Sequence, residues 1–166
     1  MSKRTVVIVG AGVFGLAAAR ELLARGWRVT VIDPGPVPTP TAASTDISKV
    51  VRMDYGADEL WTELGQRSLA RWREWNRVAG ATLFHEDGFL VLSRAVMQPG
   101  GFEFESFHFL TGRGEPLERL DSAALAQRFP GWAADKYPDG YLNPRGGWAE
   151  GGKTIAWLAT QARAEG

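Results

Sequence analysis

The first 33 residues combine two β-branched runs and a glycine pattern in an order that few folds can accommodate. Val6–Val9 contains only Val and Ile, and it leads directly into the G-x-G-x-x-G sequence of Gly10–Gly15. A stretch of helical periodicity follows, and then a second β-branched run, Val29–Ile32, which ends in Asp33. This succession of strand, glycine turn, helix, strand and acid indicates a βαβ unit that binds a dinucleotide.

Each position of this pattern has a physical role. Gly10 permits a tight turn, Gly12 lets the backbone approach a pyrophosphate, and Gly15 allows the helix to pack closely against the strand. The free N–H groups of the first helical turn favour an anion. Asp33 can accept hydrogen bonds from ribose hydroxyls and would repel a 2′-phosphate, which argues against NADP. The alternative is a plain βαβ unit with coincidental glycines, and the spacing alone does not separate FAD from NAD.

The composition argues against several other classes of protein. Lys and Arg number 19, as do Asp and Glu, so no basic field is available for nucleic acid or an anionic membrane. The chain has no Cys, which excludes disulfides, Cys-based zinc sites and thiol nucleophiles. His85 and His108 lack partners at metal-ligand spacing, so we predict no metal site. No apolar run approaches the roughly 20 residues of a membrane span, and we expect a cytoplasmic protein.

Two cations follow the predicted βαβ unit, beyond a Pro-rich loop at residues 34–40. Lys49 and Arg52 are three residues apart, a spacing that predicts a shared face of a helical turn. Two neighbouring positive charges suit an anionic ligand or an electron-rich cofactor. The alternative is a solvated basic patch in which these cations pair with Asp46 and Asp54.

Here the sequence resembles the FAD-dependent amine oxidoreductases of the D-amino-acid-oxidase superfamily. It is most similar to the branch that holds monomeric sarcosine oxidase, fructosyl-amino-acid oxidases and saccharopine oxidases. The specific part of the resemblance lies in the opening pattern through Asp33, in Asp46–Arg52 and in Tyr55-Gly56. It continues more weakly through Phe129–Gly131 and Gly147–Glu150.

The resemblance implies roles for individual residues. The FAD pyrophosphate would be held by Gly10, Gly12, Val13, Phe14 and Gly15. Asp33 would bind the ribose, and Ser44 and Thr45 would lie along the cofactor. Lys49 would sit beside the flavin ring, and Arg52 would bind the substrate carboxylate, which a guanidinium recognises with two parallel bonds.

The predicted fold class is α/β: the N-terminal part of a Rossmann-like FAD-binding fold with the start of an α+β substrate domain. We expect an FAD-binding segment at 1–80, a partial substrate domain at 81–145 and a return helix at 146–166. Periodicity and capping residues predict helices at 58–75, 121–128 and 152–165, a strand at 88–92, and a strand and turn at 141–148. Residues 102–111 begin with an alternation typical of a strand, but Phe104, Phe107 and Leu110 fit a helix, which is the prediction. The first two strands are apolar on both faces, so both faces and both edges need neighbours.

We therefore expect this chain to be an N-terminal fragment that needs a missing C-terminal half or a second chain. The predicted activity of the parent is oxidation of the C–N bond of an amine or N-substituted amino acid to an imine, with reduction of flavin. Two alternatives are an NAD-dependent dehydrogenase and a non-catalytic nucleotide-binding accessory chain.

Overall fold

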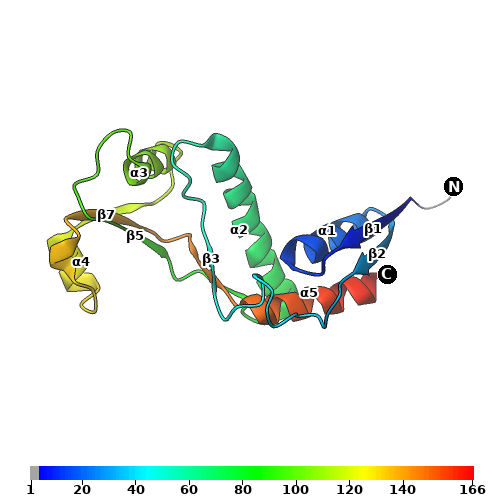
Figure 1. The fold of residues 1–166 in the computed structure, drawn as a ribbon. Coiled ribbons are helices and arrows are strands. Elements are labelled where there is room, and N and C mark those ends of the chain that lie inside the picture. Colours follow the sequence, from blue (N-terminus) through cyan, green and yellow to red (C-terminus); the bar gives the residue numbers. More distant parts are fainter. Residues whose placement is uncertain (1–3) are drawn as a thin grey trace. The chain divides into compact units, whose positions relative to one another are not determined.

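The computed structural model describes residues 4–166, which form two compact units (Figure 1). The first unit contains residues 4–49, 76–83 and 149–166, and the second contains residues 50–75 and 84–148. The α/β class predicted from the sequence is confirmed. No helix within residues 4–166 is both long enough and apolar enough to cross a membrane.

The first unit is built on a parallel pair of strands. β1 (Thr5–Val9) and β2 (Arg28–Ile32) pair in register from Thr5 opposite Arg28 to Val9 opposite Ile32. α1 (Val13–Ala24) connects them, so the predicted βαβ unit is confirmed. α5 (Gly151–Glu165) packs along α1, and its Glu165 carboxylate lies 2.7 Å from the Arg20 guanidinium. The core between these elements consists of buried aliphatic side chains: Leu16, Ala19, Ile155, Leu158 and Ala159.

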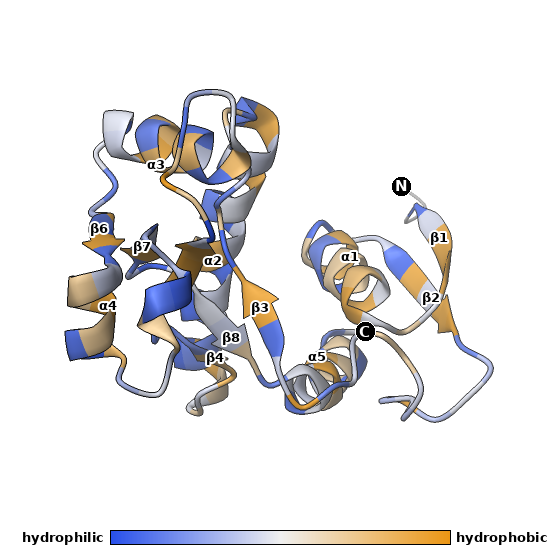
Figure 2. Ribbon diagram, turned by 60° about the vertical axis from the view of Figure 1, so that its left-hand side comes forward, coloured by the Kyte–Doolittle hydropathy of each residue, from blue (hydrophilic) through white to orange (hydrophobic). Residues whose placement is uncertain are grey.

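The two strands are covered on one face only by the described residues, although their sequence predicts that both faces need neighbours. Alternate residues along each strand are half-buried, whereas those between them are exposed. The exposed set includes Val7 at 56%, Val9 at 84% and Ile32 at 53% of their accessible area. Figure 2 shows the strands of this pair as largely hydrophobic. A row of apolar side chains therefore faces outward, because α1 covers only the opposite face.

The second unit is an antiparallel sheet with helices. β5 (Phe89–Ser93) and β6 (Glu118–Asp121) both pair with the central strand β7 (Asp139–Asn143). β3 (Lys49–Val51), β8 (Gly147–Ala149) and β4 (Phe84–His85) form a smaller sheet in that order. The helices are α2 (Glu59–Ala79), α3 (Phe102–Gly112), α4 (Ser122–Arg128) and the 3-10 turn η1 (Ala134–Lys136). The last turn of α2 and the end residues Lys49 of β3 and Ala149 of β8 are counted with the first unit.

Several of the predicted boundaries are confirmed by capping contacts. The Asp58 carboxylate accepts a hydrogen bond from the Trp61 N–H at the start of α2, and Asp121 does the same for Ala124 in α4. α2 continues four residues beyond the predicted end at Trp75.

The segment around Lys49 and Arg52 is not helical, and this prediction is wrong. Lys49–Val51 is a strand that pairs with β8. Val50 and Val51 are β-branched, which favours a pleated backbone over a helical turn. Lys49 is the first residue of this strand and Arg52 follows its end, so the three-residue spacing does not give them the common face of a helical turn.

Candidate functional site

The turn between β1 and α1 requires glycine at two positions for different reasons. Gly10 has φ +103°, a conformation that side chains disfavour, and its N–H donates to the Ile32 carbonyl at 2.7 Å. At Gly15 the backbone angles are ordinary, but an added Cβ would lie 1.9 Å from the carbonyl oxygen of Gly10. The first turn of α1 is thus packed directly against the turn that precedes it.

The N-terminus of α1 presents backbone N–H groups. Gly12 is the N-cap and has no side chain to satisfy them, and the first helical bond runs from the Leu16 N–H to the Gly12 carbonyl at 3.0 Å. The N–H of Val13 contacts the Ser44 hydroxyl at 3.4 Å, a long bond. Phe14 contributes only its backbone here, because its side chain is 90% exposed. Such a helix end attracts an anion through its N–H groups and its dipole.

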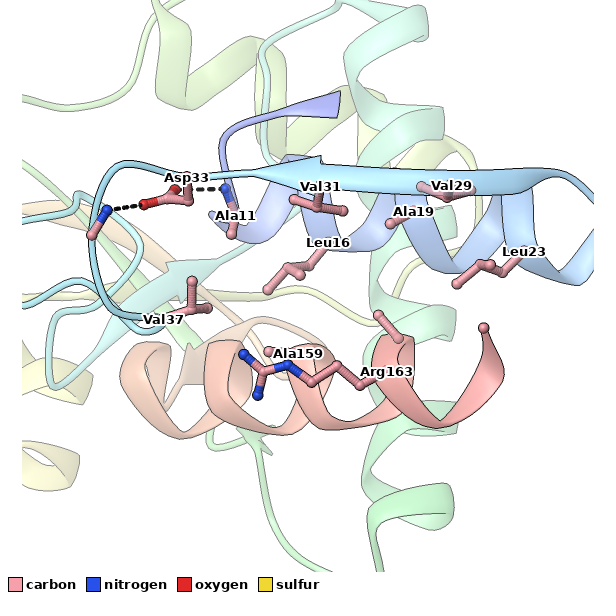
Figure 3. Close-up of a pocket in the computed structure, with 13 residues that line it drawn as sticks. Ala11, Leu16, Ala19, Leu23, Val29, Val31, Asp33, Val37, Ala159 and Arg163 are labelled. Atoms are coloured by element: carbon pink, nitrogen blue, oxygen red, sulfur yellow. Dashed lines mark hydrogen bonds between the residues drawn. The ribbon is translucent and has the colours of Figure 1, made fainter. Parts of the chain in front are cut away.

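Asp33 closes this turn from the end of β2. Its carboxylate accepts hydrogen bonds from the N–H of Ala11 at 2.8 Å and from the N–H of Gly35 at 3.1 Å (Figure 3). These bonds, that of Ala11 first, lower the pKa of the Asp33 carboxyl. The side chain stays ionised at neutral pH, and each oxygen keeps a lone pair that could accept a hydroxyl.

A pocket of about 340 Å³ opens beside Asp33 within the first unit. Figure 3 shows Asp33 and Ala11 at one end of it, with β2 and α1 along one side and α5 along the other. Its walls are mostly small or aliphatic side chains, with Arg163 as the cation: Leu16, Ala19, Leu23, Val29, Val31, Val37, Ala159 and Ala162. Such a lining suits a flat apolar group that carries polar substituents at one edge.

Ser44, Thr45 and Lys49 follow the Pro-rich loop in the first unit. The Thr45 hydroxyl is buried and has no hydrogen-bond partner among residues 4–166. The Lys49 ammonium lies 2.8 Å from the Asp46 carboxylate, and this contact is the main reason that the pKa of Asp46 is lowered. The pairing of Lys49 with Asp46 matches the surface-pair interpretation of this cation. Both groups are substantially exposed, so the pair contributes little stability.

Arg52 belongs to the second unit, where aromatic rings surround its guanidinium. The guanidinium carbon lies 4.8 Å from the ring centre of Tyr55, 5.5 Å from that of Phe89 and 5.6 Å from that of Phe102. Its Nη1 donates to the backbone carbonyl of Asp54, not to the carboxylate that the surface-pair interpretation required. Arg52 therefore keeps further N–H donors for a ligand while its position is held by rings and by one backbone bond.

Sequence reasoning missed a buried polar cluster next to Arg52. The Asp54 carboxylate accepts a hydrogen bond from the Tyr141 hydroxyl at 2.9 Å and another from the Asn143 amide at 3.0 Å. All three side chains are fully buried. Burial raises the pKa of Asp54 and that of Tyr141. Alternation of Tyr141 and Asn143 along β7 places them on one face, but nothing local in the sequence links that face to Asp54.

The structure thus brings together some of the site residues that were predicted from the sequence. The turn at Gly10–Gly15, Asp33 and Ser44 meet at one end of α1, as their mutual contacts show. Lys49 is in the same unit and is paired with Asp46. Arg52 lies in the second unit within a site of its own.

Comparisons with known proteins bear on these sites. Residues 5–166 match the family model described as "FAD dependent oxidoreductase". The chain is 43% identical over 72 residues to L-saccharopine oxidase of Schizosaccharomyces pombe, a match that covers 42% of this chain and 16% of that protein. It is 23% identical to monomeric sarcosine oxidase of a Bacillus species, over 86% of this chain and 36% of that enzyme.

Among solved structures, the open form of NikD, an unusual amino acid oxidase essential for nikkomycin biosynthesis, aligns with a TM-score of 0.75. The alignment has 26% identity and covers 99% of this chain and 42% of that one. The chain thus spans less than half the length of these relatives. Because the family model matches nearly the whole described chain, the protein belongs to the FAD dependent oxidoreductase family known as DAO.

Proposed function

We propose that this chain supplies the dinucleotide-binding turn and the substrate-carboxylate site of an FAD-dependent oxidoreductase that acts on the C–N bond of an amino acid or amine. The observation that carries this proposal is the turn at Gly10–Gly15, where a positive φ favours glycine at Gly10 and close packing excludes a side chain at Gly15. Family membership favours FAD over NAD as the dinucleotide.

The residues of the first unit fit such a cofactor. The backbone N–H groups of the first turn of α1 would hold the pyrophosphate, with Gly12 leaving room for close approach. The Asp33 carboxylate would hold the ribose hydroxyls, and the adjoining apolar pocket would hold the adenine. The buried Thr45 hydroxyl, which has no hydrogen-bond partner within residues 4–166, fits a polar atom of the cofactor. When bound, FAD would supply the acceptor for the hydride equivalent that leaves the carbon beside the amine nitrogen.

Ser44 and Lys49 would have supporting roles at the cofactor. Ser44, whose hydroxyl lies beside the Val13 N–H, would lie along the cofactor, and Lys49 would place a positive charge beside the flavin. Lys49 can do so only by exchanging or sharing its contact with Asp46.

Arg52 would bind and orient the substrate. A carboxylate can accept two parallel hydrogen bonds from the guanidinium, which fixes its plane as well as its position. Tyr55, Phe89 and Phe102 lie around the guanidinium and would limit the access of water to that contact, which strengthens it. The substrate class that this site favours is an amino acid, with an N-substituted amino acid as the narrower proposal.

We assign cofactor binding to the first unit and substrate binding to the second. The outward-facing side chains of Val7, Val9 and Ile32 favour coverage by further polypeptide, either a C-terminal half or a second chain.

Titration of the purified chain with FAD and, separately, with NAD⁺ tests this assignment. Flavin fluorescence and calorimetry should show tighter binding of FAD than of NAD⁺. Asp33→Asn should weaken FAD binding, whereas Arg52→Lys, a change in the second unit, should leave it unaltered. Tighter binding of NAD⁺ than of FAD would refute the proposal. An FAD affinity that is unchanged in correctly folded Asp33→Asn would also refute it.

A further inference from the structure

The segment that carries Arg52 is anchored on several sides within the second unit. Tyr141 and Asn143 of β7 hold the Asp54 carboxylate, and the Gly56 N–H donates to the Ser106 hydroxyl of α3 at 2.8 Å. α2 presses on the same segment, since a Cβ added at Gly65 would lie 2.8 Å from the Cα of Met53. Asp54 is the centre of this arrangement, because its carboxylate and its backbone carbonyl both accept hydrogen bonds.

The carboxylate and the backbone carbonyl of Asp54 accept hydrogen bonds from different parts of the second unit. Its carboxylate faces β7, where two directional bonds fix the orientation of the side chain. Its backbone carbonyl accepts the hydrogen bond from Nη1 of Arg52. A rotation of the Asp54 backbone would therefore move the acceptor that holds the guanidinium, and the bonds to β7 oppose such a rotation.

Packing alone does not call for a carboxylate at this place. A buried charge costs free energy even when it is hydrogen-bonded, and an apolar side chain would fill the same space without that cost. Burial raises the pKa of Asp54, while the Tyr141 and Asn143 bonds and the charge of Arg52 act to lower it. A carboxylate differs from an apolar side chain in that it accepts hydrogen bonds from two donors in a fixed plane, and these bonds fix its orientation.

We propose that Asp54 is a positioning residue: its carboxylate, held by Tyr141 and Asn143, sets the backbone carbonyl that aims the Arg52 guanidinium at the substrate carboxylate. The inference rests on the proposed role of Arg52 as the carboxylate-binding residue. The substrate itself would touch Arg52 and not Asp54.

Carboxylate binding to the whole chain can test this without any turnover. The side-chain Nε–H signal of Arg52 is assigned by comparison with Arg52→Lys and is then followed by NMR during titration with sodium acetate. The wild-type chain should show a saturable shift. Asp54→Asn and Tyr141→Phe should each raise the dissociation constant about threefold to tenfold, and should move the Arg52 signal before any acetate is added.

Asp139→Asn is the matched control. Asp139 is also a buried carboxylate of β7, but its bonds go to Arg119, to the Met97 N–H and to its neighbour Gly140, away from the Arg52 segment. This variant should lower the urea midpoint yet leave acetate affinity within a factor of two. Tyr141→Phe keeps the ring and gives a second reading if Asp54→Asn does not fold.

The outcomes separate the two proposals. Absence of a saturable shift in the wild-type chain would overturn the carboxylate role of Arg52, and the positioning role with it. Wild-type affinity in Tyr141→Phe and in folded Asp54→Asn would overturn the positioning role alone. Equal loss of affinity in Asp139→Asn would overturn it as well, since general destabilisation would then explain the effect.

Discussion

Replacement of Gly15 by alanine is the sharpest test of how the α1 turn is built. The added Cβ would lie 1.9 Å from the Gly10 carbonyl oxygen and 3.0 Å from its carbon. Because that neighbour is backbone, the helix must retreat by roughly 1 Å, and overpacking of this kind costs typically 1–3 kcal/mol. Alanine also gains up to about 1 kcal/mol over glycine in a helix, which offsets part of the cost. An overpacking cost of about 3 kcal/mol, at the upper end of that range, less about 1 kcal/mol of helix propensity leaves an expected fall of about 2 kcal/mol in the free energy of unfolding.

Gly152→Ala provides the control in the same unit. Gly152 also lies in the first turn of a helix, α5, but its added Cβ would meet the Thr45 carbonyl at an ordinary 3.4 Å. That variant should be as stable as the wild-type chain or slightly more so. Urea unfolding followed by circular dichroism measures both, and flavin fluorescence should show about tenfold weaker FAD binding in Gly15→Ala, equivalent to roughly 1.4 kcal/mol. If the two variants unfold at the same urea concentration, the inference that contact with Gly10 excludes a side chain at Gly15 is wrong.

Three further results are expected. Arg119 holds the pKa of Asp139 below its usual value, so this carboxyl stabilises the fold above about pH 4 and loses that contribution as pH falls through its folded-state pKa. Asp139→Asn should therefore make the free energy of unfolding fall less steeply as the pH is lowered. An unchanged pH dependence in this variant would contradict the role of the Arg119–Asp139 pair. Leu158→Ala should lower the free energy of unfolding by about 2–5 kcal/mol in urea titrations, because Leu158 is completely buried. Phe14→Ser should change it by less than about 0.5 kcal/mol, and a larger loss would mean that the ring packs against the protein.

The βαβ unit could be predicted because its causes are local. β-branched runs, helical periodicity and glycines at fixed spacing lie within residues 5–33, and each acts on its own segment. The helices capped by Asp58 and Asp121 were predictable for the same reason, since a capping carboxylate bonds within three residues of itself.

The errors arose where distant partners decide the structure. Spacing and nearby capping residues suggested a helical turn at Lys49–Arg52, but pairing with β8, about a hundred residues later in the chain, makes that segment a strand. The Asp54–Tyr141 bond joins residues 87 positions apart, and no periodicity connects them. The strand pattern predicted that both faces of β1 and β2 need neighbours, but it could not indicate that the described residues cover only one of them.

That outward face has a consequence for anyone who handles the isolated chain. Two short parallel strands that carry exposed Val7, Val9 and Ile32, with an open edge on either side among the described residues, form a template on which a second molecule can add its own strands. Concentrated preparations would then self-associate through the sheet. Val9→Lys, at a position that is 84% exposed at the end of β1, would place a charge on that face and oppose the association without disturbing the core.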